Sequence, residues 1–493
     1  MHAASPARTR VLRLAATAFA LGLVMVVAPV PQVAFAARSS AQISPVAGFD
    51  PLDVASLRTQ QAVTEGPIDD SRVSAVQERT GEFSMIGVGF PDVPAEPVLV
   101  RVLDERGVWS EWNELEVDRD KGPDRTSSEA AQAAPGGAVV SEPLWVESAT
   151  GFELSVGDGD AEGVKVSVVR EELRRVVTEA VPYAEAIAPA PFGIESRTTW
   201  GARPAKNTPS VASDGIKLAV VHHTASSNNY SSAQVPGILR GMQAFHMDGN
   251  GWSDIGYNFL VDKYGRIWEG RGGGTARPVV GAHAAGFNTG SVGVSVIGNY
   301  VGSNASPAAR EAVSRIIGYK LQGYNVHPQG RVDFRSGGST TIPAGKVVNL
   351  PRVIGHRDVG STSCPGVIYG SLGSIRHRAA EWANFIDALQ SPGGAINSVR
   401  VNGSTVEVSG WARDPDVSAS ARVHVVLAGR LKEVSANGYR PDIGRAYPGY
   451  GDNRGWGAGF WDVPEGTHRL CVTAINQGDG FNTLLGCRDV VVK

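Results

Sequence analysis

The residues most able to do chemistry in this chain are histidines and one cysteine in its central part. His222 and His223 end the apolar run 218–221, and His356 directly follows a second apolar run. Cys364 comes eight residues later. Side chains at strand ends can project into a cleft, where two imidazoles and a thiolate would bind one Zn2+ and leave its fourth position open. Such a centre serves hydrolysis, because zinc acidifies its water and polarises a carbonyl.

The spacing of these residues matches no short metal-binding signature, because the ligands come from separated segments. Six of the ten histidines lie between residues 222 and 356, a window wide enough for clustering by chance. Taken alone, any one of these side chains is more often a packed polar group. The residues by themselves therefore leave a catalytic zinc site and a set of structural side chains both open.

Longer motifs in the same region resemble the peptidoglycan recognition protein and phage-type N-acetylmuramoyl-L-alanine amidase family. They occur in the family's order at fitting separations, which makes the resemblance specific. They are IESRTTWGA (194–202), VHHTA (221–225), HMDGNGWSDIGYNF (246–259), DKYGRIWEGR (262–271), GAH (281–283) and GHRDVGSTSCPG (355–366).

The resemblance implies a zinc amidase that cuts the bond between N-acetylmuramic acid and L-alanine in bacterial peptidoglycan. Its metal ligands would be His222, His356 and Cys364, with catalytic roles for Tyr257 and Thr362. A hydroxyl from Tyr257 could orient the attacking water or bind the developing oxyanion. The remaining site residues are expected to contact substrate or support the ligands: His223, His246, Trp252, Asn258, Arg271 and His283.

Each of these assignments has a structural alternative. Tyr257 can be a buried strand tyrosine, and Trp252 can line the groove or pack in the core. Asp358 can support a ligand or simply close a turn, while His327, next to a proline, is expected at the surface. Two other function classes compete with the amidase. A glycosidase needs a pair of carboxylates across a cleft, and no such pair has motif support. A non-catalytic peptidoglycan-binding surface protein would keep the groove without needing zinc.

The elements that would position this chemistry form a central α/β domain over 194–392, with a mixed β-sheet flanked by helices. Strands are expected over 217–221, 258–261, 267–269 and 291–297, from their short apolar runs. Helices are expected over 235–245 and 375–389. A further helix begins after Ser306, which precedes a proline at the first helical position.

All-β, sandwich-like modules are expected on both sides, because short apolar runs alternate there with turn residues. They span 82–170, with a long loop over 121–139 and no catalytic constellation, and 395–493. A flexible lead (37–81) precedes the first module, and a proline- and alanine-rich linker (171–193) follows it. The fold class is therefore multidomain.

Residues 1–36 have the pattern of a secretory signal peptide: three arginines, an apolar stretch and a small-residue cleavage site ending at Ala36. An uncleaved membrane anchor is the alternative. After cleavage we expect a secreted or wall-associated protein with no stable membrane insertion. Export favours a disulfide between Cys471 and Cys487, leaving Cys364 as a liability or a ligand. The net charge of −3 gives no sign of a nucleic-acid partner, so the expected partner is the cell-wall polymer.

Overall fold

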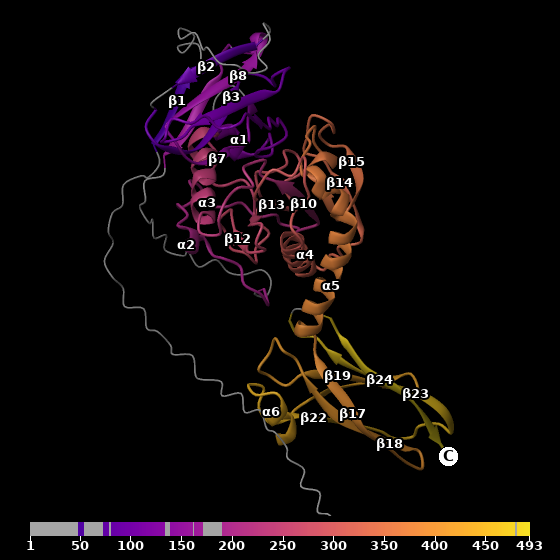
Figure 1. Ribbon diagram of the computed structural model, residues 1–493. Coiled ribbons are helices and arrows are strands. Elements are labelled where there is room, and N and C mark those ends of the chain that lie inside the picture. Colours follow the sequence, from indigo (N-terminus) through magenta and orange to yellow (C-terminus); the bar gives the residue numbers. More distant parts are fainter. Residues whose placement is uncertain are drawn as a thin grey trace, which may run out of the picture. The chain divides into compact units, whose positions relative to one another are not determined.

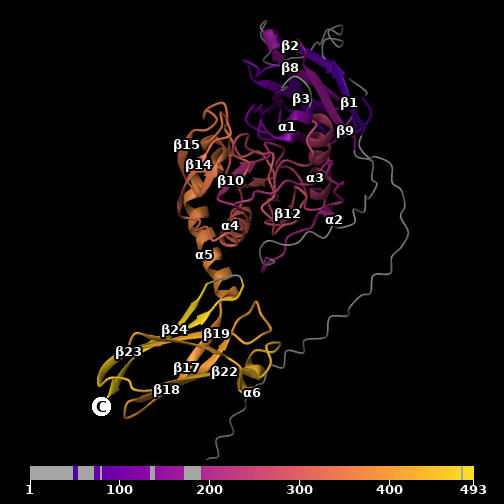
Figure 2. The ribbon, with the colours of Figure 1, turned by 180° about the vertical axis from the view of Figure 1, so that it is seen from behind.

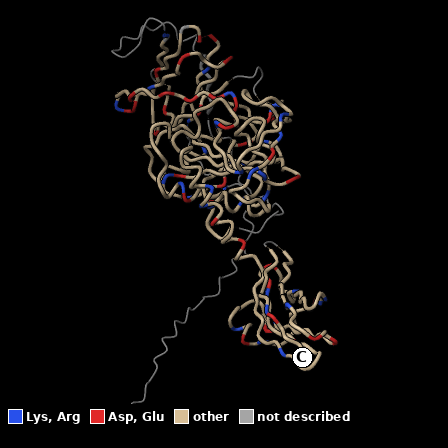
Figure 3. The backbone as a smooth tube through the Cα atoms, turned by 90° about the vertical axis from the view of Figure 1, so that its right-hand side faces the viewer, with Lys and Arg blue, Asp and Glu red and all other residues tan. Residues whose placement is uncertain are grey.

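The computed structural model describes residues 48–53, 72–77, 80–133, 139–160, 162–170, 190–478 and 481–493. The predicted signal peptide, and most of the predicted lead and linker, lie outside these residues. Within the described ranges, no helix combines the length and the apolar character needed to cross a bilayer. Acidic and basic residues are scattered along the described backbone, without long stretches of one sign (Figure 3).

The N-terminal part consists of two antiparallel sheets around one core (Figure 1). Large apolar side chains from both sheets meet in that core, among them Phe83, Val98, Phe152 and Val166. The first sheet has the order β1 (Gly48–Asp53), β9 (Lys165–Arg170), β3 (Phe83–Phe90) and β6 (Val139–Val140), and β7 (Leu144–Ala149) also pairs with β3. The second has the order β2 (Arg72–Gln77), β8 (Gly151–Gly157), β4 (Val98–Leu103) and β5 (Asn113–Leu115).

The strands of this part begin earlier than the expected boundary at residue 82. Strand β1 pairs with β9 and strand β2 pairs with β8, although both lie in the segment expected to be a lead. The sequence of β1 is GFDPLD, in which a proline and two aspartates leave no apolar alternation. Because β1 is an edge strand with a single neighbour, it tolerates the proline. Its sequence pattern alone does not predict a strand.

The central sheet is mixed, as expected, with the order β12, β11, β13, β10 and β16. Strand β10 runs parallel to both β13 and β16, whereas β11 and β12 form an antiparallel hairpin. These strands are nearly continuous apolar runs because both faces of the sheet are covered. Their bounds are β10 (Leu218–His223), β11 (Phe259–Val261), β12 (Ile267–Glu269), β13 (Ser291–Val296) and β16 (Val353–Gly355).

Helices cover the two faces of this sheet (Figures 1 and 2). Helices α4 (Pro307–Gln322) and α5 (Leu372–Gln390) pack on one face through a core that includes Val294, Ile317 and Ile375. Helices α2 (Arg197–Trp200) and α3 (Val235–Ala244) pack on the other. Helix α4 begins as predicted, since the Ser306 hydroxyl accepts a hydrogen bond from the amide of Ala309 at 3.0 Å. A hairpin of β14 (Arg331–Arg335) and β15 (Val347–Pro351), not predicted, completes this part.

The C-terminal part has two four-stranded sheets that share one core, which agrees with the predicted all-β module. Cys471 and Cys487 lie opposite each other on neighbouring strands and form the expected disulfide. The first sheet is β17 (Gly393–Asn402), β18 (Thr405–Arg413), β22 (Asn453–Phe460) and β21 (Gly438–Tyr439). The second is β20 (Arg430–Ser435), β19 (Arg422–Leu427), β23 (Gly466–Ile475) and β24 (Thr483–Val492), and a short α6 (Pro441–Ala446) precedes β22.

The turn between β11 and β12 depends on Asp262, which is fully buried. Its carboxylate accepts hydrogen bonds from the backbone amides of Tyr264 and Arg266, each at 3.0 Å. It also accepts from the guanidinium of Arg266 at 2.6 Å and from the indole of Trp268 at 3.1 Å. Replacing Asp262 with alanine leaves these donors without a partner. We expect a loss of about 3 kcal/mol of stability, discounted for the partial exposure of Arg266.

Calorimetry checks this expectation, because such a loss lowers the melting temperature of a domain of this size by roughly 6–12 °C. The matched control is Asp214→Ala, which removes a surface aspartate paired with Lys217. Exposed ion pairs contribute little, so the control should melt like the wild type. Equal melting temperatures for both variants would contradict a structural role for Asp262.

Candidate metal centre

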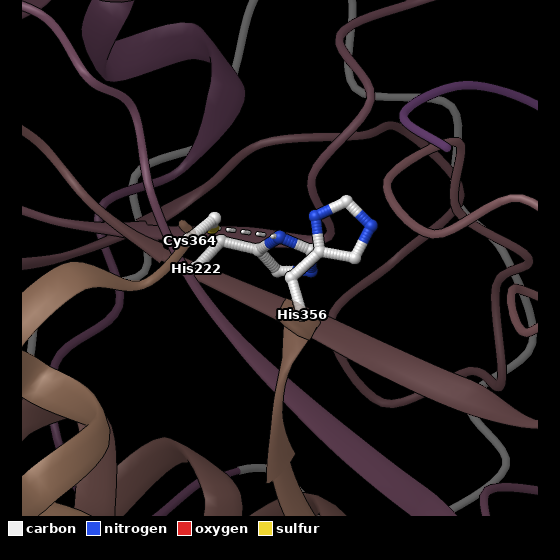
Figure 4. Close-up of side chains that lie close together, drawn as sticks. All are labelled: His222, His356 and Cys364. Carbon is white, nitrogen blue, oxygen red and sulfur yellow. Dashed lines mark hydrogen bonds between the residues drawn. The ribbon is translucent and has the colours of Figure 1, made fainter. Parts of the chain in front are cut away.

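The sheet brings His222 and His356 together because they end neighbouring parallel strands. Val221 on β10 pairs with Gly355 on β16, so the next residue of each strand projects from the same edge of the sheet. Cys364 reaches that edge after a short turn, in which the amide of Arg357 donates to the carbonyl of Cys364 at 3.0 Å. Figure 4 shows the three side chains gathered at one point. Their ligand atoms all lie within 4.8 Å of one another, and Nδ1 of His222 is 3.6 Å from Sγ of Cys364.

All three side chains are buried, and burial shifts the pKa of His222 and of Cys364. Burial lowers the pKa of His222, and the neighbouring His356 and His283 lower it further. Burial also raises the pKa of the Cys364 thiol, and the charge of Glu116 adds to that effect. Neutral imidazole is the form that binds metals, and a metal ion deprotonates a thiol that ligates it.

The donor set fits zinc. Nε2 of His356 is buried and has no hydrogen-bond partner among the described residues. A buried polar atom without a partner is costly unless something outside the chain satisfies the site. Two nitrogens and one sulfur are ligands that zinc accepts in tetrahedral sites with one open position. His222, His356 and Cys364 are thus able to hold the ion that the sequence led us to expect.

The two residues expected to be catalytic border this cluster. The Tyr257 ring lies 5.4 Å from the His222 ring, and its hydroxyl donates to the carbonyl of His223 at 3.3 Å. Burial raises the pKa of Tyr257, so it is a neutral phenol that can donate a hydrogen bond. The hydroxyl of Thr362 donates to Glu116 at 2.8 Å and accepts from the amide of Cys364 at 3.2 Å.

Two of the residues expected to bind substrate contact the cluster itself. Nδ1 of His283 lies 3.1 Å from Nε2 of His222, a contact that fixes the orientation of the His222 ring. The backbone of His223 lies beside Cys364, its amide 3.4 Å from the sulfur. The His223 side chain points elsewhere, since its Nε2 lies 2.7 Å from a carboxylate oxygen of Glu116. His283 is therefore placed as a support for His222.

The side chains of the other four residues in that group contact other groups of the protein. His246, in a π-helical turn that continues α3, stacks on Trp252 with ring centroids 4.6 Å apart. The side-chain amide of Asn258 donates to the carbonyl of Val279 at 2.9 Å and accepts from the amide of Gly293 on β13 at 2.8 Å. Arg271 forms a salt bridge of 2.5 Å with Glu129. All four are buried, although Arg271 also lines a hollow that borders Glu129.

The structure also shows the surroundings of Asp358, whose role the sequence left open, and of His327, which was expected at the surface. Asp358 closes the turn that carries His356, because its carboxylate accepts from the amide of Gly355 at 2.9 Å and from the hydroxyl of Tyr369 at 2.6 Å. His327 is exposed, as expected. Asp358 therefore shapes the backbone around His356. Neither of these hydrogen bonds involves the His356 ring.

Sequence reasoning missed a group of charged residues that the N-terminal part contributes to the centre. Glu116 binds His223, Thr362 and Ser363, and Oδ2 of Asp118 lies 3.2 Å from Nδ1 of His356. Burial raises the pKa of Asp118, although the charge of His356 opposes this. Burial likewise raises the pKa of Glu116, but the hydrogen bond and charge of His223, with two hydroxyl donors, outweigh it and lower the pKa to about 2.

Lys121 completes this group. Its ammonium lies 4.7 Å from the centre of the Tyr257 ring and pairs with Glu142. Burial lowers the pKa of Lys121 to about 7. The sequence did carry a signal for this segment: acidic residues recur at every second position at 114, 116, 118 and 120, starting within β5 and continuing beyond it. Such a row is unusual beside an apolar sandwich, because alternate residues share one face.

Comparisons with known proteins match the part of the chain that carries the cluster. Residues 212–367 match the family model described as N-acetylmuramoyl-L-alanine amidase. Peptidoglycan-recognition protein SC2 of Drosophila simulans is 36% identical over 194 residues, which cover 39% of this chain and 87% of that protein. The N-acetylmuramoyl-L-alanine amidase of Sus scrofa is 32% identical over 200 residues, covering 40% of this chain and 29% of that protein.

A mixed sheet with a histidine–histidine–cysteine cluster at its edge thus coincides with a family match over the same residues. The chain belongs to the peptidoglycan recognition protein and N-acetylmuramoyl-L-alanine amidase family. Among solved structures, Drosophila PGRP-LB aligns with 29% identity and a TM-score of 0.30, covering 37% of this chain and 93% of that chain. A second family model, described as Rv3811 N-terminal galactose-binding domain-like, matches residues 44–183.

Proposed function

We propose that this protein is a zinc-dependent amidase that hydrolyses the bond between N-acetylmuramic acid and L-alanine in peptidoglycan. The observation that carries the proposal is the convergence of His222, His356 and Cys364, whose ligand atoms lie within 4.8 Å of one another. A family member that only binds peptidoglycan needs no such cluster. Here the complete donor set is buried beside a neutral tyrosine hydroxyl, which favours the enzyme.

In the proposed reaction, zinc supplies Lewis acidity toward the scissile carbonyl and a water acidified to near neutral pH. The chain's own residues do the rest. His222, His356 and Cys364 hold the ion, and His283 fixes the ring of His222. The hydroxyl of Tyr257 donates a hydrogen bond to the oxygen on which negative charge develops. Thr362, two residues before Cys364, holds the carbonyl side of the substrate once its hydroxyl is released from Glu116.

We further propose that the protein is exported through its N-terminal segment and acts at the cell wall. The charge pattern of residues 1–36 and the disulfide of Cys471 with Cys487 support an oxidising, extracytoplasmic location. The catalytic domain would span 194–392, with β modules over 82–170 and 395–493 that position it on the polymer. The strands β1 and β2 suggest that the first module begins earlier than that boundary.

Mass spectrometry of defined muropeptides after incubation with the zinc-loaded protein tests the proposed function. We expect release of the stem peptide with a free L-alanine amine, abolished by a chelator and restored by Zn2+. His356→Ala should remove this activity. His327→Ala, an exposed histidine of the same domain, should keep whatever activity the wild type has. Muropeptide binding without cleavage by zinc-loaded wild type would instead support a non-catalytic peptidoglycan-binding protein.

A further inference from the structure

A loop of the N-terminal part lies directly over the metal centre. This acidic loop, residues 116–132, leaves β5 and ends with the short helix α1 (Ser128–Gln132). At its start, Glu116 and Asp118 contact His223 and His356. Its backbone there is tied to its own module, because the amide of Glu142 donates to the carbonyl of Glu116 at 2.7 Å. The loop is therefore anchored in one module while its side chains enter the other.

The middle of the loop is held by backbone amides and side chains of the catalytic domain. The buried carboxylate of Asp120 accepts from the amides of Thr340 and Ser361 at 2.7 and 3.0 Å. Asp124 accepts from the amide of Gly286 at 2.8 Å and from the side chains of Asn288 and Thr289 at 2.8 and 2.9 Å.

The far end of the loop reaches Arg271, which the sequence assigned to substrate binding. The carboxylate of Glu129 binds the guanidinium of Arg271 at 2.5 Å and accepts from the amide of Ser253 at 2.9 Å. Side chains of this one loop thus make contacts all the way from the metal centre to Arg271. Two of the contacted residues, His223 and Arg271, are among those expected to bind substrate.

The result is a centre sealed from solvent. His222, His356 and Tyr257 are each 1% exposed, and Cys364 is 5% exposed. Two hollows border the loop, one lined by Glu116 and Thr362 and the other by Asp124 and Arg271. Neither hollow is lined by a metal ligand or by Tyr257. An amidase needs the scissile carbonyl of its substrate beside the metal. Because the proposed ligands are buried, a polymeric substrate cannot reach them in this conformation.

We propose that the acidic loop is a built-in inhibitor, which occupies the substrate groove and must move away before peptidoglycan can bind. This inference rests on the proposed function, because a groove that binds muropeptide is what the loop would block. The carboxylates of the loop bind cationic and N–H groups of the groove. The state in which the loop covers the groove is therefore low in free energy while substrate is absent. Binding of the substrate then competes with the loop for the same donors.

The test weakens the loop's anchors without touching the metal ligands or Tyr257. The variant is Asp124→Ala with Glu129→Ala, and its matched control is Glu111→Ala with Glu114→Ala. The control removes two exposed carboxylates of the same module just before the loop. Both double variants lose the same charge and nearly the same volume, so a difference between them reports on the loop contacts.

Two readouts are compared. The first is the rate at which a thiol reagent labels the metal-free protein in its full length. Two of the three cysteines are joined in a disulfide, so the reagent reports on Cys364 alone. The second is muropeptide turnover by the zinc-loaded protein. We expect the loop variant to label at least tenfold faster than wild type and to turn over substrate at least tenfold faster, while the control matches wild type in both.

Each outcome decides something. Unchanged labelling of the loop variant would overturn the proposal, because the loop would then not shield Cys364. Faster labelling with slower turnover would also overturn it, since the loop would then complete the active site. Faster labelling with no turnover by any protein, wild type included, would support the loop as a cover while the amidase proposal fails. The two hypotheses are therefore separable.

Discussion

Cys364→Ser is expected to abolish zinc binding at micromolar metal and, with it, amidase activity. The substitution would replace the proposed soft, anionic sulfur ligand with a hydroxyl that stays protonated at neutral pH. Outer partners of metal ligands alone alter metal affinity by about 10–100-fold, so loss of a ligand should cost more. Turnover should fall by roughly a thousandfold or more, because zinc contributes several kcal/mol to the transition state and each 1.4 kcal/mol is tenfold.

Metal content by elemental analysis and turnover of a defined muropeptide measure these two losses separately. Serine has almost the shape of cysteine, so the sheet around it should stay intact, and circular dichroism provides that check. The control is Ser363→Ala, which changes the neighbouring residue without removing a ligand. A serine variant that retains stoichiometric zinc and full turnover would rule out Cys364 as a ligand.

Tyr257→Phe is expected to lower kcat by about 10²–10³-fold, the usual cost of losing one donor to an oxyanion. Zinc content should stay at the wild-type level, because the tyrosine lies beside the ligands without being one of them. KM should change little, since the lost hydrogen bond forms with charge that develops only in the transition state. The aromatic ring remains, so its packing against His222 is preserved.

Steady-state kinetics on the zinc-loaded variant separate kcat from KM. The matched control is Tyr264→Phe, which removes the hydroxyl of a partly exposed tyrosine in the same domain. Its hydroxyl donates to the carbonyl of Tyr230 at 3.0 Å, away from the metal centre. An unchanged kcat for Tyr257→Phe would assign that residue to packing, the structural alternative noted from the sequence.

Much of the central fold follows from local patterns. The apolar run that becomes β10 and the helical spacing of α3 are statements about nearby residues, and the structure bears both out. Ser306 and the proline after it fixed the start of α4 for the same reason. The ligand set was a different matter. Its residues lie far apart in sequence, so only the ordered family motifs singled out His222, His356 and Cys364 from the other candidates.

The contacts of Glu116 and Asp118 with the site lay beyond that reasoning. They join residues more than one hundred positions apart across two modules, and neither hydrophobic periodicity nor the amidase motifs describe how modules dock. The early strand β1 was missed for a related reason. Its pairing with β9 specifies it, and its own composition does not. Both omissions concern partners that are distant in sequence.

The pairing of β10 with β16 has one more consequence. Adjacent strands in a sheet are about 4.8 Å apart, a spacing maintained by backbone hydrogen bonds. Because His222 and His356 extend from two such neighbours, the gap between their imidazoles is dictated by the sheet and needs no ion to draw them together. The proposed zinc site is thus preformed by the fold, and the apoprotein should keep the same conformation when the ion is removed.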